Sequence, residues 1–384
     1  MVPEPKLLVP GPTPVPQAIF QAMITPMVAH RNPETVELHH RIVQGLQALW
    51  STKGPVILQS SSGSGALEAS IANACARGDR VLAVSAGAFG ERFGTIATRL
   101  GMDVDWLRFP WGEATPPDDI AAALRQKNYQ AVLLIHNETS TGVLHPIPEI
   151  ARAVRNLVPV ILVDSISGTP SVPTDIDPWG VDMVIATSQK GFMMPPGLGL
   201  VGLGHDAQSH FRGEPSLYFD FGPSTTGQFH YTMPVSMIFA LAKSVELLEE
   251  EGAEARYARH RLMSEMVCAG AAAMGFTVLG DMARQSPTVT VIAPPDGVSN
   301  HDIRGFAHRH GLDLAGGIGQ WADRALRVGH VGATGPLDML MAINILELSL
   351  ATVGHIPVDG RGSAAALKVW ERYVKETEGV PVKA

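Results

Sequence analysis

Short apolar segments alternate with amphipathic segments through the first half of the chain, from Pro16 to Gly204. A short apolar run bounded by turn residues is typical of a strand buried on both faces, whereas apolar residues three and four positions apart indicate a helix that covers a sheet. Their alternation predicts an α/β fold with a doubly wound, largely parallel sheet. The predicted strands are Val56–Gln59, Arg80–Ser85, Val104–Phe109, Ala131–His136, Val160–Asp164, Met183–Thr187 and Leu198–Gly202, and the predicted helices between them include Glu34–Trp50, Ala66–Ala76, Phe89–Leu100, Pro117–Lys127 and Ile147–Asn156.

The pattern changes after the last of these strands. Residues 234–274 form a long helical region that is interrupted near Gly252, and helices of this length often connect domains. The first 16 residues contain six prolines, which predict an extended arm. We therefore expect an N-terminal arm over 1–16, a large domain over 17–255 and a smaller C-terminal α+β domain over 256–384. The strands expected in the smaller domain are Thr277–Leu279, Thr288–Ile292 and Ala325–Val328, and its helices are Ser299–His310, Pro336–Thr352 and Ser363–Lys375.

Composition narrows the class of protein. Of the 384 residues, 45% are hydrophobic and 17% are charged, so the chain can bury large cores and is neither disordered nor fibrous. The net charge is −8 and no cluster of Lys or Arg occurs, so we expect no nucleic-acid partner. No apolar stretch has the length of a membrane helix, and the N-terminus lacks the layout of a secretion signal. We therefore expect a soluble, cytoplasmic protein with no membrane partner.

The cysteines and histidines favour structural roles. Cys75 and Cys268 are too few for a disulfide framework or a Cys-rich zinc site, and we expect both to be buried in helices. The 14 histidines show no spacing that is typical of metal ligands, so the sequence predicts no metal site. The most closely spaced histidines are interpreted as solvated helix residues, namely His39, His40, His308 and His310.

A small, Gly-rich loop follows the first predicted strand and precedes a helix that we expect to begin at Ala66. The loop consists of residues 60–65, SSSGSG, and its backbone N–H groups and hydroxyls suit a phosphate at a helix N-terminus. A flexible connection capped by serine explains the same residues equally well. The loop is not a full dinucleotide-binding GxGxxG motif, because Glu68 stands where the third glycine is required.

Three consecutive strands of the predicted sheet end in polar groups that fit one cofactor. The first is followed by the Ser/Thr-rich residues 137–142, the second ends at Asp164, and the third is followed by Lys190. Each alone has an ordinary explanation, such as a turn-capping carboxylate or a surface amine. Lys190, however, is the only charged residue from Met183 to Gly204, and desolvation makes a lysine amine available for a Schiff base. Because pyridoxal phosphate needs such a lysine, a carboxylate at its pyridinium nitrogen and a helix N-terminus for its phosphate, the pattern predicts this cofactor.

Four short segments also resemble the class V (fold type I) aminotransferases, and most closely their alanine–glyoxylate / serine–pyruvate group. They are residues 138–142 (ETSTG), 163–165 (VDS), 188–190 (SQK) and 195–197 (PPG), and the resemblance covers nearly the whole chain. It implies a pyridoxal-phosphate-dependent enzyme that moves an amino group from alanine or serine to glyoxylate or pyruvate, in the two half-reactions of a ping-pong mechanism. It also implies a homodimer with shared active sites.

The resemblance assigns roles to residues of this chain. Lys190 would form the Schiff base and move the proton, Asp164 would pair with the pyridinium nitrogen, and Arg327 would bind the substrate carboxylate. Phe89 would stack on the cofactor ring, and the backbone near Gly11 would line the substrate pocket. The other expected cofactor contacts are Ser62, Gly63, Ser64 and Gln189 at the phosphate, Ser140 near the ring hydroxyl, and Thr232 at the partner subunit's phosphate, where Phe229 replaces the usual Tyr and Tyr231 is an alternative.

Other functions stay open at this point. Aminotransferases of the same family that act on phosphonate, ureidoglycine or phosphoserine-type substrates are alternatives, because substrate choice depends on loop shape. A cysteine desulfurase or selenocysteine lyase is disfavoured, since both cysteines fall in predicted helices and Gln189 stands where a His is typical. A nicotinamide dehydrogenase would require the missing third glycine. A non-catalytic accessory subunit would have no use for Lys190, Asp164 and Arg327 together.

Overall fold

The computed structural model describes residues 5–226 and 231–378, and its larger sheet has seven strands. Neighbouring strands run parallel except at one strand near the edge, which is antiparallel to both of its neighbours. The predicted largely parallel sheet is therefore confirmed. In order across the sheet, the strands are β2 (Val56–Gln59), the antiparallel β10 (Gly199–Leu203), β9 (Met183–Thr187), β8 (Val160–Asp164), β5 (Ala131–Ile135), β3 (Arg80–Ser85) and β4 (Asp103–Arg108).

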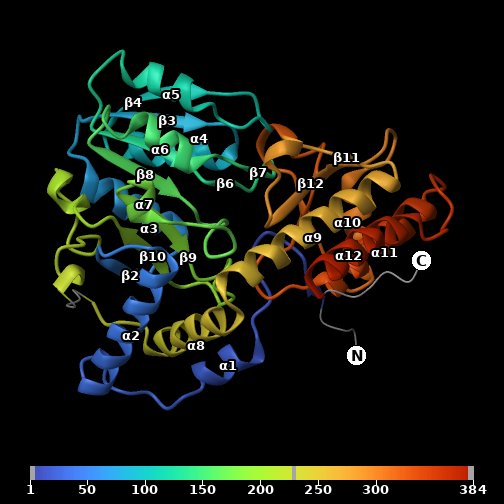
Figure 1. Ribbon diagram of the computed structural model, residues 1–384, viewed down its shortest axis with the longest axis horizontal. Helices are drawn as coiled ribbons and strands as arrows, with labels where there is room; N and C mark the ends of the chain where they lie inside the picture. Colours follow the sequence, from blue (N-terminus) through green and yellow to red (C-terminus); the bar gives the residue numbers. More distant parts are fainter. Residues whose placement is uncertain (1–4, 227–230, 379–384) are drawn as a thin grey trace.

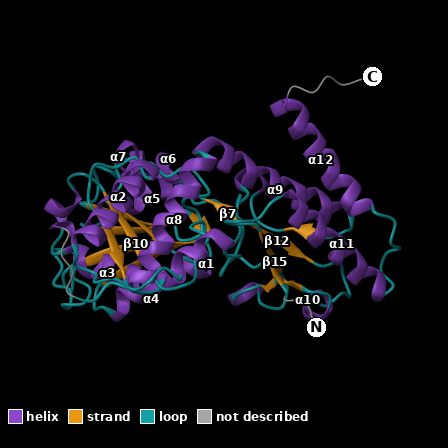
Figure 2. Cartoon of the chain, turned by 90° about the horizontal axis from the view of Figure 1, so that it is seen from below, coloured by secondary structure: helices purple, strands orange, loops and turns teal. Residues whose placement is uncertain are grey.

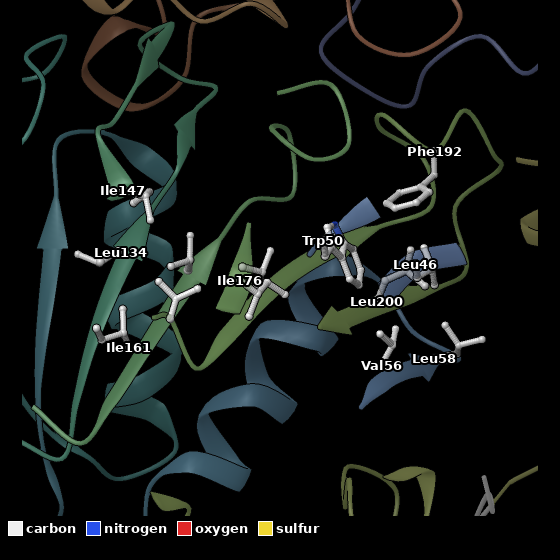
Figure 3. Packing of buried hydrophobic residues seen from close by; sticks show 14 of the residues in the cluster. Leu46, Trp50, Val56, Leu58, Leu134, Ile147, Ile161, Ile176, Phe192 and Leu200 are labelled. Carbon is white, nitrogen blue, oxygen red and sulfur yellow. The ribbon is translucent and has the colours of Figure 1, made fainter. Parts of the chain in front are cut away.

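Helices cover both faces of this sheet, because its central strands are apolar on both sides. Leu134 of β5 belongs to the core beneath α2, α5, α6 and α8, whereas the adjacent Leu133 belongs to the core beneath α3 and α4. Figure 3 shows the first of these cores, in which the rings of Trp50 and Phe192 meet edge to face with centroids 6.1 Å apart. The helices on the two faces are α2 (Pro33–Leu49), α5 (Pro117–Leu124), α6 (Ile147–Val154) and α8 (Val235–Glu251), and α3 (Gly63–Ala74) and α4 (Ala88–Arg99).

The element boundaries agree closely with the sequence pattern. Every predicted strand of the larger sheet is present with its ends within one residue of the prediction. The main difference lies at α3, which begins at Gly63 and not at Ala66, because the Gly-rich loop itself forms the first helical turn. Short elements without a periodic pattern were not predicted, namely α1 (Gln17–Met23), β6 (Asn137–Glu138), β7 (Val143–Leu144) and α7 (Ile176–Trp179).

A second, antiparallel sheet of four strands forms the core of the C-terminal part, and Figure 2 shows the two sheets in separate lobes side by side. The long helical region is divided at Gly252, where the backbone φ of +76° ends α8 before α9 begins, so the predicted interruption is confirmed. Figure 1 shows α8 and α9 running from the first lobe to the second. The strands in order are β11 (Thr277–Val278), β12 (Val289–Ala293), β15 (Leu326–Gly329) and β14 (Ala315–Gly316), and the helices are α9 (Ala253–Ala273), α10 (Asn300–Arg309), α11 (Pro336–Thr352) and α12 (Arg361–Glu378).

The N-terminal arm connects the second lobe to the carboxyl ends of the larger sheet. Its short strand β1 (Lys6–Leu7) pairs in parallel with β13 (Leu312–Asp313). The next residue, Leu8, accepts a hydrogen bond from the backbone N–H of Gly329 at 2.7 Å. The arm then reaches Gly11, which lies against the side chain of Lys190. The predicted extended arm is thus part of the structure around the strand ends.

One prediction about the histidines is wrong. His39 is buried on the inner side of α2, and this burial lowers its pKa to about 4, whereas His40, His308 and His310 are exposed as expected. Cys75 is buried directly after α3, Cys268 is half-buried in α9, and both are free. In residues 5–226 and 231–378, no helix is long and apolar enough to cross a bilayer. Nor does any group of three His, Cys, Asp or Glu residues within this part of the chain form a candidate metal site.

Candidate active site

The N-terminus of α3 lies at the carboxyl ends of the larger sheet and has the form of an anion site. Ser62 caps the helix, because its Oγ accepts a hydrogen bond from the N–H of Gly65 at 3.3 Å. Gly63 is buried, and a Cβ at this position would lie 2.8 Å from Cδ1 of Ile166. Glycine therefore lets the helix end approach the strand ends closely, where its free N–H groups and dipole favour a negatively charged ligand.

Asp164 ends β8 and is only 5% exposed. Its Oδ1 accepts a hydrogen bond from the N–H of Ile166 at 2.9 Å. The pKa of Asp164 is raised to about 7, mainly by burial and also by the nearby carboxyl of Glu138, while the Ile166 hydrogen bond and the amine of Lys190 oppose the shift. A buried carboxyl with such a pKa is poised to pair with a cation, and this property often marks a functional site.

Lys190 follows β9, and its amine is enclosed by the N-terminal arm. The Nζ atom donates a hydrogen bond to the carbonyl of Pro10 at 2.5 Å. A Cβ on Gly11 would lie 2.6–2.7 Å from Cδ, Cε and Nζ of Lys190, so only glycine allows this approach. The pKa of Lys190 is lowered to about 8, mainly by burial and also by the guanidinium of Arg327, while Asp164 opposes the shift. The amine is thus more available as a nucleophile or base than a solvated lysine.

These groups meet in one cavity of about 240 Å³ at the carboxyl ends of the strands. Of the residues predicted from the sequence, the structure brings eight together on its wall: Gly11, Ser62, Gly63, Ser64, Phe89, Asp164, Gln189 and Lys190. This is the position at which open α/β sheets bind their ligands.

Phe89 enters the cavity from the first turn of α4. Arg92, one turn later, also lines the cavity and lies over the Phe89 ring, with its guanidinium carbon 5.4 Å from the ring centroid. Such a contact orients the ring and places a positive charge at the cavity wall. Arg92 was not predicted as a site residue, because it is separated from every strand end by part of α4.

Arg327, on β15 of the second lobe, lies beside the cavity and is not among the described residues that form its wall. Its Nε donates a hydrogen bond to the carbonyl of Gly316 at 2.8 Å, and its Nη1 donates to the carbonyl of Thr139 at 3.4 Å. Burial lowers its pKa to about 10, while the carboxylate of Glu138 opposes that shift. Since Thr139 itself lines the cavity, the guanidinium is held one residue behind the wall.

Ser140 does not reach the cavity wall. Its Oγ donates a hydrogen bond to Glu138 at 2.6 Å and accepts one from the N–H of Ala88 at 2.9 Å. The neighbouring Thr139 faces the cavity in its place, and its hydroxyl is 2.6 Å from that of Ser167. Which of two adjacent polar residues faces a cavity depends on the local backbone, so the sequence could not distinguish them.

Further polar residues of the wall come from the strand ends and were missed. The Nδ2 atom of Asn137 donates to the Ser167 hydroxyl at 2.8 Å, and the Thr187 hydroxyl donates to Oε1 of Gln189 at 2.7 Å. Thr187 ends β9, and Asn137 and Ser167 lie within three residues of the ends of β5 and β8, so proximity to a strand end is a signal that could have identified these three residues. They orient one another, so the cavity wall is organised before any ligand enters.

The segment expected to reach a partner subunit is only partly described. Phe229 lies outside the described residues. Thr232 is exposed and is not on the cavity wall. The hydroxyl of Tyr231 donates to the carbonyl of Leu58 within the same chain at 3.3 Å, and its ring stacks on Tyr218 with centroids 4.7 Å apart.

The residues of the cavity fit pyridoxal phosphate. The Gly63 position supplies a cradle that a Cβ would fill, at a helix end suited to the phosphate. Asp164 is a buried carboxyl suited to a cationic ring nitrogen, and Lys190 is a desolvated amine on the same wall. The donor set therefore matches the three requirements that the sequence pattern suggested.

Comparison with known proteins defines the class. The Aminotransferase class-V family matches residues 9–320, and the chain belongs to this family, whose members in general depend on pyridoxal phosphate. The predicted transaminase class is thereby confirmed.

Individual relatives are similar over almost their whole length. A serine–glyoxylate aminotransferase of Methylorubrum extorquens is 35% identical over 379 residues, which cover 94% of both chains. A protein of Synechococcus sp. named soluble hydrogenase, small subunit, is 34% identical over 375 residues, or 94% of this chain and 97% of the relative. The crystal structure of a ureidoglycine–glyoxylate aminotransferase from Bacillus subtilis has a TM-score of 0.91 and 27% identity, and the match covers 97% of this chain and 99% of that one. The predicted fold type is confirmed.

Proposed function

We propose that this chain binds pyridoxal phosphate in the cavity and transfers the amino group of a small amino acid, alanine or serine, to glyoxylate or pyruvate. The observation that carries the proposal is the meeting of Lys190, Asp164 and the α3 N-terminus on one wall. The names of the relatives in Methylorubrum extorquens and Bacillus subtilis support glyoxylate as the acceptor.

The bound cofactor supplies an electron sink that makes the α-proton of an amino acid acidic. The amine of Lys190 holds and moves that proton, because its lowered pKa keeps part of it neutral. At pH 7 a pKa of about 8 leaves about 9% of the amine neutral, against about 0.03% for an unperturbed lysine. The desolvated position of Lys190 therefore increases the reactive form about 300-fold.

Asp164 and Arg327 would supply the two charged contacts. Asp164 would keep the proton on the ring nitrogen, because an adjacent cation favours the ionised form of its buried carboxyl. Arg327 would bind the carboxylate of the substrate, since a guanidinium pairs with it through two parallel hydrogen bonds. Ser62, Gly63, Ser64 and Gln189 would hold the phosphate, and Phe89 would stack on the ring.

The proposal includes a homodimer that completes the site. The residues assigned to the phosphate within one chain are uncharged, so a partner contact would add to the binding of this dianion. Thr232 is exposed and free to face a second copy. Large apolar side chains are also exposed near α1 and near residue 218, and such surfaces are typical of subunit contacts. These side chains are Phe20, Ile24, Met27, Leu217 and Tyr218.

The domain division and the cellular location belong to the same proposal. The division into a large domain over 17–255 and a small domain over 256–384 is supported by the interruption at Gly252. A cytoplasmic location is supported by the two free cysteines. Limited proteolysis tests the first, and cell fractionation tests the second.

The visible absorption spectrum of the purified protein tests the function. We expect a band from bound cofactor that L-alanine bleaches and glyoxylate restores, because each substrate completes one half-reaction. The variant K190A should show neither response. A band that ignores alanine and serine would move the proposal to another substrate of the family, such as ureidoglycine.

The Synechococcus relative motivates a second candidate, a non-catalytic accessory subunit. The absence of any band after reconstitution with pyridoxal phosphate would favour it. The meeting of Lys190 and Asp164 on one cavity wall argues for the enzyme, because a scaffold gains nothing from two buried ionisable groups.

A further inference from the structure

Glu138 is a fully buried carboxylate that the proposed mechanism does not use. It lies on β6, directly after β5, and each of its oxygens accepts hydrogen bonds. Oε1 accepts from the N–H and the hydroxyl of Ser140 at 3.1 and 2.6 Å. Oε2 accepts from the N–H groups of Phe89 and Gly90 at 3.2 and 3.1 Å. Burial raises the pKa of Glu138, whereas the hydrogen bonds from Ser140, Gly90 and Phe89 lower it, and because every partner is a donor these bonds favour the ionised carboxylate.

These bonds cap α4 from outside its own sequence. The N-cap residue of α4 is Gly87, which has no side chain to satisfy the first N–H groups. Ser140 accepts from the N–H of Ala88, and Glu138 accepts from the next two. A Cβ on Gly87 would lie 2.4 Å from Cγ and Cδ of Glu138, so glycine makes room for the carboxylate. The first turn of α4, which carries Phe89 into the cavity, is therefore fixed by Glu138.

The segment that contains Glu138 and Thr139 also binds the guanidinium of Arg327. Its Nη1 donates to the carbonyl of Thr139, the residue after Glu138, at 3.4 Å. The negative charge of Glu138 attracts the guanidinium and opposes the effect of burial on the Arg327 pKa. A single carboxylate thus lies between the element that carries the ring-stacking residue and the side chain expected to bind substrate.

We propose that Glu138 is a positioning residue that sets both Phe89 and Arg327 for aminotransfer, through its cap on α4 and its charge beside the guanidinium. This inference rests on the proposed function. Glu138 itself would contact neither cofactor nor substrate, whereas Phe89 and Arg327 would bind them. We therefore expect the loss of Glu138 to weaken binding more than it slows the chemical step.

The variant E138Q tests the inference, because it keeps the size of the side chain and removes its charge. Both oxygens of Glu138 face donors, so the amide NH₂ of glutamine would face an N–H or O–H in either orientation. We expect the cofactor dissociation constant of the apo protein and the KM for the amino donor each to rise about tenfold, as the loss of one charge-assisted hydrogen bond implies. We expect kcat to fall less than about threefold, since Lys190 and Asp164 keep their places.

The matched control is E347Q. Glu347 of α11 is 1% exposed and also accepts backbone N–H groups from outside its own helix, since its Oε1 accepts from the N–H groups of Asp359 and Gly360, directly before α12, at 3.1 and 2.8 Å. It does not line the cavity. Both variants should lose thermal stability, but only E138Q should lose affinity for cofactor and donor. Equal cofactor affinity and equal KM in the two variants would overturn the inference.

The variant S140A covers the case in which E138Q does not fold. It removes the 2.6 Å hydrogen bond that orients the carboxylate and should raise KM about threefold, whereas an unchanged KM and cofactor affinity would count against the positioning role. Cofactor binding by the wild-type protein distinguishes failure of the proposed function from failure of the role proposed for Glu138. If wild type binds no pyridoxal phosphate, the proposed function fails; if it binds and E138Q matches E347Q, only the role of Glu138 fails.

Discussion

The contact between Gly11 and Lys190 predicts that one methyl group on the N-terminal arm disables the site. In G11A the new Cβ would lie 2.6–2.7 Å from three atoms of the lysine side chain. Non-bonded carbon atoms are most stable at about 3.5–4.0 Å, so the side chain must move by about 1 Å. A displacement of this size can reduce turnover about 100-fold, because the amine no longer meets the reacting atoms.

The G11A substitution also strains the backbone, so the control variant must carry a similar backbone strain. Gly11 has a φ of +132°, and a residue with a side chain in such a conformation costs about 1–3 kcal/mol. Gly78 also has a positive φ, +86°, but a Cβ there would have no neighbour within 4 Å. The variant G78A therefore carries backbone strain without the contact at Lys190.

The assay is kcat with alanine and glyoxylate, together with the free energy of unfolding from urea titration. We expect both variants to lose about 1–3 kcal/mol of stability and only G11A to lose about 100-fold in kcat. A folded G11A with kcat within threefold of wild type would refute the reasoning, because the arm would then not constrain Lys190.

Three further predictions concern the charged groups of the cavity. D164N should abolish transamination and stabilise the apo protein at pH 8. The pKa of Asp164 is raised from 3.8 to about 7, so the ionised carboxylate destabilises the folded apo state by up to about 4 kcal/mol above pH 7. Urea titration of the two proteins at pH 8 measures this difference. R327K should raise KM for the amino donor at least about tenfold with a smaller change in kcat, because an ammonium cannot make the paired hydrogen bonds of a guanidinium; equal KM values would remove Arg327 from the substrate site. The rate at which apo protein takes up pyridoxal phosphate should rise with pH with a midpoint near pH 8, as Lys190 loses its proton, and a midpoint near pH 10 in a stopped-flow titration would contradict the lowered pKa.

The larger sheet was predictable because its strands are buried on both faces. Such strands need uninterrupted apolar residues, and β2, β3, β8 and β9 have the predicted boundaries. The second lobe was predicted at the level of its main elements, but the short strands β13 and β14 were missed, since two residues are too few to show a period. His39 was misjudged because its neighbour at the next position is exposed, and one sequence does not reveal which face of α2 is inside.

For the site, sequence order was sufficient where function depends on strand ends. Parallel strands bring their carboxyl ends to one edge of the sheet. Residues that follow β2, β8 and β9 therefore lie close together irrespective of the conformation of the loops. This explains why Ser62, Asp164 and Lys190 were found and share one cavity wall. The choice between Thr139 and Ser140 depended on the direction of adjacent side chains in a short segment, which no periodic pattern reports.

The amino-acid sequence by itself determined the sheet, its helices and the three groups that suit pyridoxal phosphate, because each follows from local apolar patterns and from the geometry of parallel strands. Only the tertiary structure decided which distant groups complete the site. The arm at Pro10 and Gly11, Arg92 of α4 and Arg327 of β15 come from separate parts of the chain. The buried charge of Glu138 connects two of these elements, and such a connection exists only after long-range packing has removed water from between them.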